Sequence, residues 1–264
     1  MLDRFSYSSI QTFKKCPAQF KFRYIDKIYK KDEGIEAFLG KRVHESIEYL
    51  YNRIKSGFMP ILDEVLKVHK SLWKEKWHKK IAIYYSNNSP RDYFFLGEQC
   101  ISRFYRKYQP FSKNVLSNEY EVEFNLDNDP NYRLKGIIDR IDHDGKGNWS
   151  IHDYKTGKRY FTQDEADNDT QLALYQIGIT NKFDEVKSVQ LVWHFLQHGI
   201  MVKSTKTDDE LSKITRKTKM EIDKIRSEIN NSGEFKPNPM ILCNWCYYWD
   251  ECTAKDTTNP YTNN

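Results

Sequence analysis

Apolar side chains recur at three- and four-residue steps near the start of the chain, and this periodicity predicts helices. Ser8 or Ser9 is expected to cap the first helix. Cys16-Pro17 then interrupts it, because proline suits the first turn of the helix that follows. The same periodicity predicts further helices in the segments 36–57, 61–110, 168–181 and 208–230.

Between these helical segments apolar and polar residues alternate, which is typical of half-buried strands. Such strands are expected at 120–126, 132–141 and 149–155, and a buried strand at 186–196. A short turn that contains glycine joins the second strand to the third, so these two should pair antiparallel. Helices mixed with a few short strands predict an α/β or α+β fold around a small mixed sheet.

The composition fits one globular domain over residues 1–264, with 61–110 as a helical insertion. No segment approaches the roughly 18 apolar residues that a membrane helix needs, and no apolar signal core precedes Lys14-Lys15. We therefore expect a cytoplasmic protein with reduced cysteines and no membrane partner. The formal net charge of +5 permits an anionic partner but does not require one.

Two carboxylates and a lysine come together in the predicted sheet. Asp153 and Lys155 share one strand face, because side chains alternate with period two, and they lie about 7 Å apart along it. Asp139 belongs to the neighbouring strand. Such a cluster is costly for structure alone, whereas a divalent cation between the carboxylates would offset the cost. An exposed Asp–Lys ion pair on the strand surface is the alternative interpretation.

A hard cation at this position has a defined chemistry. It binds a phosphate oxygen and lowers the pKa of its bound water. Lys155, next to that water, would orient the nucleophile or stabilise the negative charge that develops. The three residues therefore indicate metal-dependent hydrolysis of a phosphate ester.

Five motifs, in this order along nearly the whole chain, resemble those of the RecB-like group of PD-(D/E)XK nucleases. They are Ser9-Ile-x2-Phe13-x2-Cys16-Pro17-x2-Phe20, Gly40-x3-His44, Gly136-Ile-Ile-Asp139-Arg140, Ile151-His-Asp153-Tyr-Lys155-Thr-Gly157-Lys158 and Gln171-x3-Tyr175. The resemblance implies a restriction-endonuclease-like core, with a small central mixed sheet flanked by helices, an N-terminal helical region and a C-terminal iron–sulfur tail.

The resemblance also implies the roles of individual residues at a catalytic site. Mg²⁺ or Mn²⁺ would be bound by His44, Asp139, Asp153 and the main-chain carbonyl of Tyr154. Lys155 would be the catalytic lysine. The site would be completed by Gln171 and Tyr175.

Other readings remain open for several of these residues. Arg140, Lys158 and Tyr175 are candidates for DNA contact, but Arg140 suits an ion pair with Asp142 equally well, and Tyr175 suits ordinary packing. A single histidine such as His44 is more often a core or surface residue than a ligand. Glu121 is considered as an extra ligand, against the simpler interpretation of a solvated strand residue.

The cysteines form a second constellation of ligands. Cys243-x2-Cys246-x5-Cys252 is compact, and Cys16 precedes a proline far upstream. Four soft ligands suit either zinc or an iron–sulfur cluster, and their spacing does not separate the two. The split of one cysteine plus three resembles the iron–sulfur type of AddB-like and CRISPR-associated RecB-like nucleases, which implies a 4Fe–4S cluster that joins the N-terminal helices to the C-terminal tail. Cys100 is read as a buried core thiol.

Several functions are compatible with these motifs. The first is an exonuclease that acts on single-stranded DNA or DNA ends in repair or recombination. A CRISPR-associated nuclease that trims DNA for spacer acquisition is the alternative, as is a catalytically silent iron–sulfur DNA-binding module. The chain has no GxxxxGK-S/T loop, so unwinding would need a helicase partner, and CRISPR adaptation proteins are the partners in the alternative setting.

Overall fold

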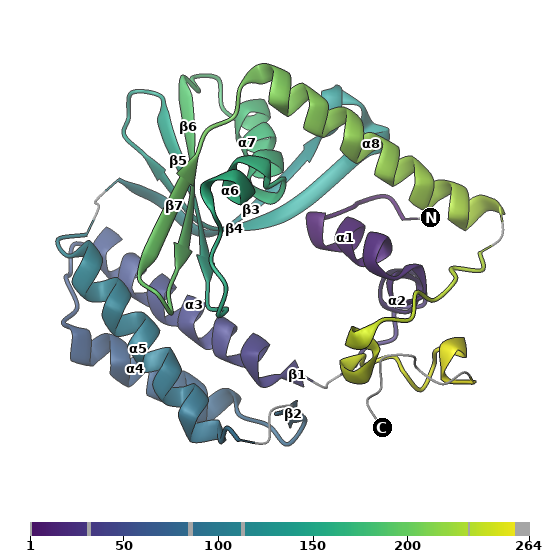
Figure 1. The fold of residues 1–264 in the computed structure, drawn as a ribbon. Helices are drawn as coiled ribbons and strands as arrows, with labels where there is room; N and C mark the ends of the chain where they lie inside the picture. Colours follow the sequence, from purple (N-terminus) through teal and green to yellow (C-terminus); the bar gives the residue numbers. More distant parts are fainter. Residues whose placement is uncertain (1, 31–32, 84–86, 112–113, 232, 257–264) are drawn as a thin grey trace. The chain divides into compact units, whose positions relative to one another are not determined.

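The computed structural model describes residues 2–30, 33–83, 87–111, 114–231 and 233–256 of the 264-residue chain. The chain divides into two compact units, which are considered separately (Figure 1). Unit 1 is formed by Met1–Asp32, Glu123–Gly136 and Ser212–Asn264, and unit 2 by Glu33–Val122 and Ile137–Leu211. The single domain over 1–264 stays a prediction.

A five-stranded sheet is the centre of unit 2, in the order β3-β4-β5-β6-β7. Strand β5 pairs antiparallel with β4 and parallel with β6, and β6 pairs antiparallel with β7, so the sheet is mixed as predicted. The ends of β3 and β4 belong to unit 1. The strands are β3 (Val115–Asn125), β4 (Arg133–His143), β5 (Asn148–Lys155), β6 (Ser188–Phe195) and β7 (Ile200–Ser204).

Helices flank both faces of this sheet. One face packs against α5 (Pro90–Tyr108), where the Phe104 and Tyr154 ring centroids lie 5.4 Å apart. On the other face Phe183, the residue that ends α7 (Gln171–Lys182), packs on Trp149 with centroids 4.5 Å apart. The remaining elements of unit 2 are β1 (Glu33–Gly34), α3 (Ile35–Lys55), α4 (Leu62–Lys76), β2 (Ile81–Ala82) and α6 (Gln163–Asn168).

Helices α4 and α5 approach each other closely at a glycine. A Cβ on Gly97 would lie 2.6 Å from His69 Nε2 and 2.9 Å from Leu39 Cδ1, which is shorter than real contacts allow. Glycine is therefore required there by packing. His69 itself is fully buried, and Cys100, one helical turn after Gly97, is fully buried too, as the sequence predicted.

Unit 1 joins the N-terminal helices to the C-terminal tail. Asn238 Nδ2 donates to the main-chain oxygen of Lys15 at 3.0 Å, and the ring of Phe235 stacks on the buried Phe20 at 6.1 Å. Tyr248 donates from its hydroxyl to the Ile28 carbonyl at 3.1 Å. The helical elements are α1 (Tyr7–Lys15), α2 (Pro17–Phe20), η1 (Lys21–Ile25), η2 (Leu126–Asn128), η3 (Pro130–Tyr132), α8 (Asp208–Asn231), η4 (Ile241–Trp245) and η5 (Thr253–Asp256), and the first residues of α8 belong to unit 2.

The structure corrects three sequence predictions and adds short strands that were not predicted. Ser6, rather than Ser8 or Ser9, caps α1, because its hydroxyl accepts from Ser9 N at 3.1 Å. The helix predicted at 168–181 begins at Gln171, after the separate α6, and β7 had not been predicted. The predicted helical segment 61–110 consists of α4 and α5 with the short β2 between them, and 84–86 lie outside the described residues.

No helix within the described residues is long and apolar enough to cross a membrane.

Candidate active site

Asp153 and Lys155 share one face of β5, as the alternation predicted. Lys155 Nζ lies 2.9 Å from Asp153 Oδ1 and 2.7 Å from Oδ2. Asp153 is only 6% exposed, so this is not a solvated surface ion pair. In β4, Arg140 is the partner of His152, so the preceding Asp139 points to the Asp153 face. Asp139 Oδ2 accepts a hydrogen bond from Tyr154 N at 2.7 Å, which fixes it beside β5.

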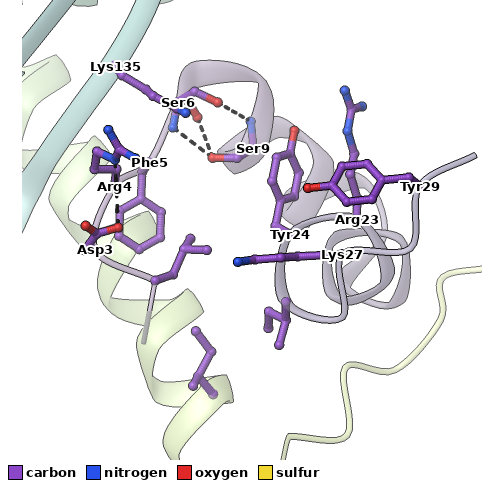
Figure 2. A pocket seen from close by; sticks show the side chains of 13 residues that line it. Asp3, Arg4, Phe5, Ser6, Ser9, Arg23, Tyr24, Lys27, Tyr29 and Lys135 are labelled. Carbon is purple, nitrogen blue, oxygen red and sulfur yellow. Dashed lines mark hydrogen bonds and ion pairs between the residues drawn. The ribbon is translucent and has the colours of Figure 1, made fainter.

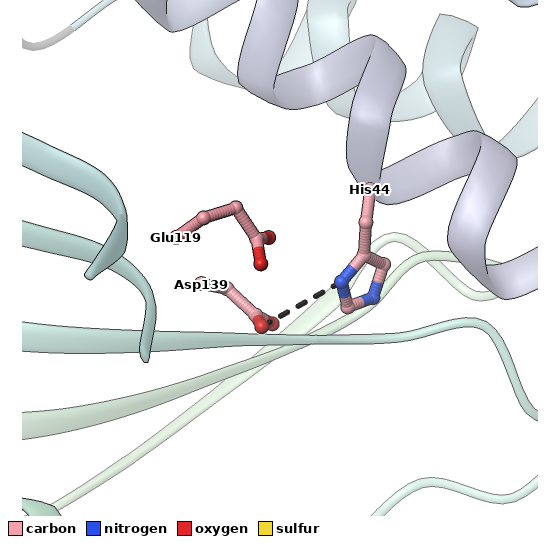
Figure 3. Close-up of side chains that lie close together, drawn as sticks. All are labelled: His44, Glu119 and Asp139. Atoms are coloured by element: carbon pink, nitrogen blue, oxygen red, sulfur yellow. Dashed lines mark ion pairs between the residues drawn. The ribbon is translucent and has the colours of Figure 1, made fainter. Parts of the chain in front are cut away.

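His44 reaches the same place from helix α3. One turn earlier, Gly40 lets the helix approach the end of β5, since a Cβ there would lie 3.1 Å from Thr156 Oγ1. His44 Nε2 lies 2.8 Å from the main-chain oxygen of Tyr154, and Nδ1 lies 3.6 Å from Asp139 Oδ1 (Figure 3). The structure thus brings together the histidine, the aspartate and the carbonyl that the sequence motifs had singled out.

Glu119 is a further acidic residue at the site, and no sequence motif pointed to it. One ligand atom each from His44, Glu119 and Asp139 lies within 4.8 Å of the other two (Figure 3). Glu119 has φ of 45°, a left-handed backbone conformation that costs free energy for a residue with a side chain. Glu121, the neighbour considered from the sequence, is not part of this group.

The pKa shifts of His44, Glu119 and Asp153 show that negative charge is in excess at this site. Burial lowers the pKa of His44, but the carboxylates of Asp139 and Asp153 and the Tyr154 carbonyl outweigh it and raise that pKa to about 9. Burial and then the charge of Asp139 raise the pKa of Glu119 to about 7. Burial also raises the pKa of Asp153, against the opposing charge of Lys155. Burial also raises the pKa of Asp139, but the charge and hydrogen bond of His44, the hydrogen bond from Tyr154 N and the charge of Lys155 together hold it below its usual value.

This donor set fits a divalent cation. The carboxyl groups of Glu119 and Asp139 converge with the imidazole of His44, and the charge of Asp153 acts on that imidazole. The pKa values of Glu119 and Asp153 are raised. A cation bound by carboxylate, carbonyl and imidazole ligands would satisfy the same negative charges, which is the ligand chemistry of Mg²⁺ and Mn²⁺ sites.

Gln171 and Tyr175 stand at the N-terminal end of α7, near these charges. Gln171 hydrogen-bonds the Tyr175 hydroxyl. The charges of Asp153, Asp139 and Lys155 also act on the pKa of that hydroxyl. Tyr175 is 9% exposed, and burial is the main reason that its pKa is raised. Asp169 stabilises the start of α7, because its Oδ1 accepts a hydrogen bond from Gln171 N at 2.9 Å. The charge of Lys155 also acts on the pKa of Asp169. The sequence analysis had not identified Asp169.

The side chain of Arg140 lies inside the protein rather than at the surface. Arg140 is 4% exposed, and its Nε lies 2.9 Å from Asp142 Oδ1, so the ion pair, not the DNA contact, is what the structure supports. Arg140 also donates to the Tyr154 hydroxyl at 3.1 Å and contacts His152. Lys158 is exposed after β5, and its main-chain oxygen contacts His198 Nε2 at 2.7 Å.

Unit 1 carries the four predicted cluster ligands. All are free thiols, and Cys252 is buried. Burial raises the pKa of Cys246 and of Cys252, and for both the charges of Cys16 and Cys243 add to it. The four sulfur atoms therefore share one neighbourhood. Met240 N donates to Cys243 Sγ at 3.3 Å, the kind of contact that stabilises a thiolate.

The family model of the PD-(D/E)XK nuclease superfamily matches residues 4–253. A solved structure from Eubacterium rectale, described as a candidate exonuclease, shares 15% identity with a TM-score of 0.54, covering 93% of this chain and 88% of that one, and therefore supports the fold. The structure of a protein called SSO0001 shares 15% identity over 97% of this chain and 89% of its own, with a TM-score of 0.42. No protein with a curated description matches the chain.

Proposed function

This chain belongs to the PD-(D/E)XK nuclease superfamily, and we propose that it is a metal-dependent DNA nuclease of the RecB-like type. We propose further that it is an exonuclease that acts on single-stranded DNA or DNA ends in repair or recombination. The observation that carries the proposal is the convergence of His44, Glu119 and Asp139 beside the buried Asp153–Lys155 pair. A surface ion pair would have neither this burial nor this excess of carboxylates.

His44, Asp139, Asp153 and the Tyr154 carbonyl would hold Mg²⁺ or Mn²⁺, and Glu119 adds a carboxylate on the same side. Bound there, the ion would supply Lewis acidity to a phosphate oxygen and a more acidic water. The hydrogen bond from Tyr154 N keeps Asp139 oriented, and the close approach of α3 at Gly40 keeps His44 in reach of it.

Lys155 is a cation, not a general base, in this arrangement. Burial favours the neutral amine, but the charge and hydrogen bond of Asp153 outweigh it and raise the pKa of Lys155 above its usual value. The protonated Nζ can donate to the attacking water or to the phosphate, and so stabilise the negative charge that develops in the transition state. Gln171 and Tyr175 close the side of the site nearest α7 and would orient the substrate.

The four cysteines of unit 1 would hold a 4Fe–4S cluster in this proposal. Their shared neighbourhood supports a common metal centre, and the one-plus-three arrangement along the chain supports iron–sulfur over zinc. Such a centre would add a covalent link between the N-terminal helices and the C-terminal tail, which already contact each other through Phe20 and Phe235. Anaerobically purified protein should contain iron and sulfide and absorb visible light, and Cys243→Ser should lose both. Stoichiometric zinc without iron would contradict the cluster.

The nuclease is tested with end-labelled DNA. Single-stranded and double-stranded substrates, labelled at the 5′ or the 3′ end, are incubated with the protein in Mg²⁺, Mn²⁺ or EDTA. We expect cleavage with either metal, none in EDTA, and stepwise loss of nucleotides from an end of the single strand. The control is Lys155→Ala, which keeps the carboxylates but removes the cation. Equal cleavage by the two proteins, or cleavage in EDTA, would contradict the mechanism.

A further inference from the structure

Unit 1 contains a pocket of about 570 Å³ that the catalytic site does not use. Its walls come from the N-terminal segment before α1, from η1 and the residues after it, and from single positions in β4 and α8. Four cationic side chains line it, Arg4, Arg23, Lys27 and Lys135, against one carboxylate, Asp3 (Figure 2). The volume lies within the range of pockets that hold drug-sized ligands.

Most of this positive charge is not neutralised by the protein. Among the described residues, Arg4 is the one cation of the pocket with acidic partners, Asp3 at 3.9 Å and Glu123 at 3.7 Å. Within the part of the chain that the structure describes, Arg23, Lys27 and Lys135 have no ion pair. Cations of one sign around a concave surface focus the electrostatic field and raise the local concentration of anions.

Aromatic rings stand beside these cations. Tyr24 and Tyr29 line one side of the pocket, and Lys27 extends into the space between them and Phe5 (Figure 2). Tyr29 is 86% exposed, so its ring is available to a ligand, whereas Phe5 is buried and forms a fixed wall. Arg23 Cζ lies 5.3 Å from the centroid of the Tyr24 ring, which places a guanidinium and a ring on the same side. Proteins bind single-stranded nucleic acids with cationic side chains along the phosphate backbone and aromatic side chains that stack on the bases.

We propose that this pocket binds a nucleotide of a single DNA strand, with phosphate on its cations and the base against Tyr24 or Tyr29. A duplex fits less well, because its bases are already stacked and paired. The proposal rests on the proposed function for the choice of DNA, and it adds a second place where the substrate is held. It is specific to unit 1 and independent of the metal site.

The test measures binding without cleavage. The full-length protein in EDTA is titrated into a fluorescent single-stranded oligonucleotide, and the anisotropy is followed at several salt concentrations. The pocket variant is Arg23→Gln/Lys27→Gln. The matched control is Lys67→Gln/Lys74→Gln, which removes the same charge from two exposed lysines of α4. Each protein's thermal melting is recorded, so that unfolding is not mistaken for lost affinity.

We expect the pocket variant to bind about tenfold more weakly and the control to stay within about twofold of the wild type. The slope of log affinity against log salt should become shallower by about 1.4, which corresponds to two lost phosphate contacts on a single strand. Tyr29→Ala should weaken binding to the single strand by about tenfold while leaving the salt slope unchanged. Equal affinities of the pocket variant and the control would overturn the proposal.

Further measurements distinguish this proposal from a small-molecule site and from a failure of the proposed nuclease function. A free deoxynucleoside monophosphate is titrated by calorimetry: if the pocket variant loses its binding but keeps full affinity for the strand, the pocket is a small-molecule site and the proposal fails. If the wild type cleaves DNA but the pocket variant binds normally, only the pocket proposal fails. If the wild type neither binds nor cleaves DNA, the proposed function fails with it.

Discussion

The two faces of strand β5 carry buried charged groups, but they balance their charges differently. On one face, Asp153 and Lys155 join His44, Glu119 and Asp139, and carboxyl groups are in excess. On the other face, Arg140 pairs with Asp142, and the histidines of β5 and β6 sit against that pair. Burial of charged groups therefore does not by itself indicate a ligand site. An excess of charge of one sign, as on the face of Asp153, does indicate one.

The second face is a closed hydrogen-bond network. His152 Nδ1 lies 2.9 Å from His194 Nε2, and His194 Nδ1 lies 2.9 Å from the Tyr108 hydroxyl. Burial raises the pKa of Asp142, but His152 and Arg140 outweigh it, and the net shift is downward. That carboxylate is paired with Arg140 and His152, whereas the pKa values of Glu119 and Asp153 are raised. The network lies on the face of β5 opposite to Asp153 and Lys155.

The largest expected effect lies on the catalytic face. Lys155→Ala should lower the rate of DNA cleavage about 10³-fold, because it removes the donor aimed at the developing charge. Binding of the strand in EDTA should be unchanged. Single-turnover cleavage at saturating enzyme measures the chemical step. A loss of less than tenfold would mean that Lys155 does not act in the transition state.

Arg140→Met probes the network face in the same way. It leaves Asp142 buried without its cation, so the free energy of unfolding should fall by about 3–5 kcal/mol, measured by urea denaturation. The double variant Arg140→Met/Asp142→Leu should recover much of this loss, because no unpaired charge remains. If Arg140→Met instead keeps its stability and loses only DNA affinity, the DNA contact considered from the sequence is correct after all.

Acid should weaken the network through its histidines. Burial lowers the pKa of His152 to about 4, below the unfolded value of 6.5. The unfolded chain therefore binds a proton between these two values while the folded chain does not, so the stabilising effect is present above pH 6.5 and lost as pH falls toward 4. We expect about 2 kcal/mol less stability from this group at pH 5 than at pH 7. His152→Gln should flatten this dependence in urea titrations; an unchanged pH profile would contradict the assignment.

The smallest effects form a matched pair. Glu119→Gln removes a carboxylate from the face of β5 on which carboxyl groups are in excess. The melting temperature without metal should therefore rise slightly, whereas the affinity for Mn²⁺ should fall about tenfold. Asp142→Asn removes the carboxylate from the balanced face, and the melting temperature should fall, with Mn²⁺ affinity unchanged. For each variant, the melting temperature and the stabilisation by Mn²⁺ are measured in thermal melts with and without the metal. A fall in melting temperature for both variants would erase the distinction between the faces.

The sequence predicted the catalytic face well because alternation along a strand is a local property. Asp153 and Lys155 had to share a face once β5 was recognised, and the antiparallel pairing across a short turn brought Asp139 beside them. The start of α8, which the periodicity predicted at 208, is equally local: Thr207 N donates to Glu210 Oε2 at 2.8 Å, one half of a capping box. Family motifs supplied His44, whose approach depends on tertiary packing.

What the sequence missed depends on geometry that periodicity does not describe. Glu119 precedes the strand expected at 120–126, and its left-handed φ of 45° departs from the regular alternation of a strand, so periodicity does not indicate that it joins His44 and Asp139. Arg140 was open between two interpretations, because only the fold decides whether a guanidinium is buried. The pocket of unit 1 combines N-terminal residues with Lys135 of β4 and Ile229 of α8, which no local pattern joins.

We expect the carboxylates of Asp139, Asp153 and Glu119, on β4, β5 and β3, to bind a divalent metal ion. Calorimetric titration of Mn²⁺ into the wild type and into Asp139→Asn tests it directly, with Asp142→Asn as the control from the other face. We expect saturable Mn²⁺ binding for the wild type and Asp142→Asn, and an affinity at least tenfold lower for Asp139→Asn. Equal Mn²⁺ affinity of the wild type and Asp139→Asn would contradict it.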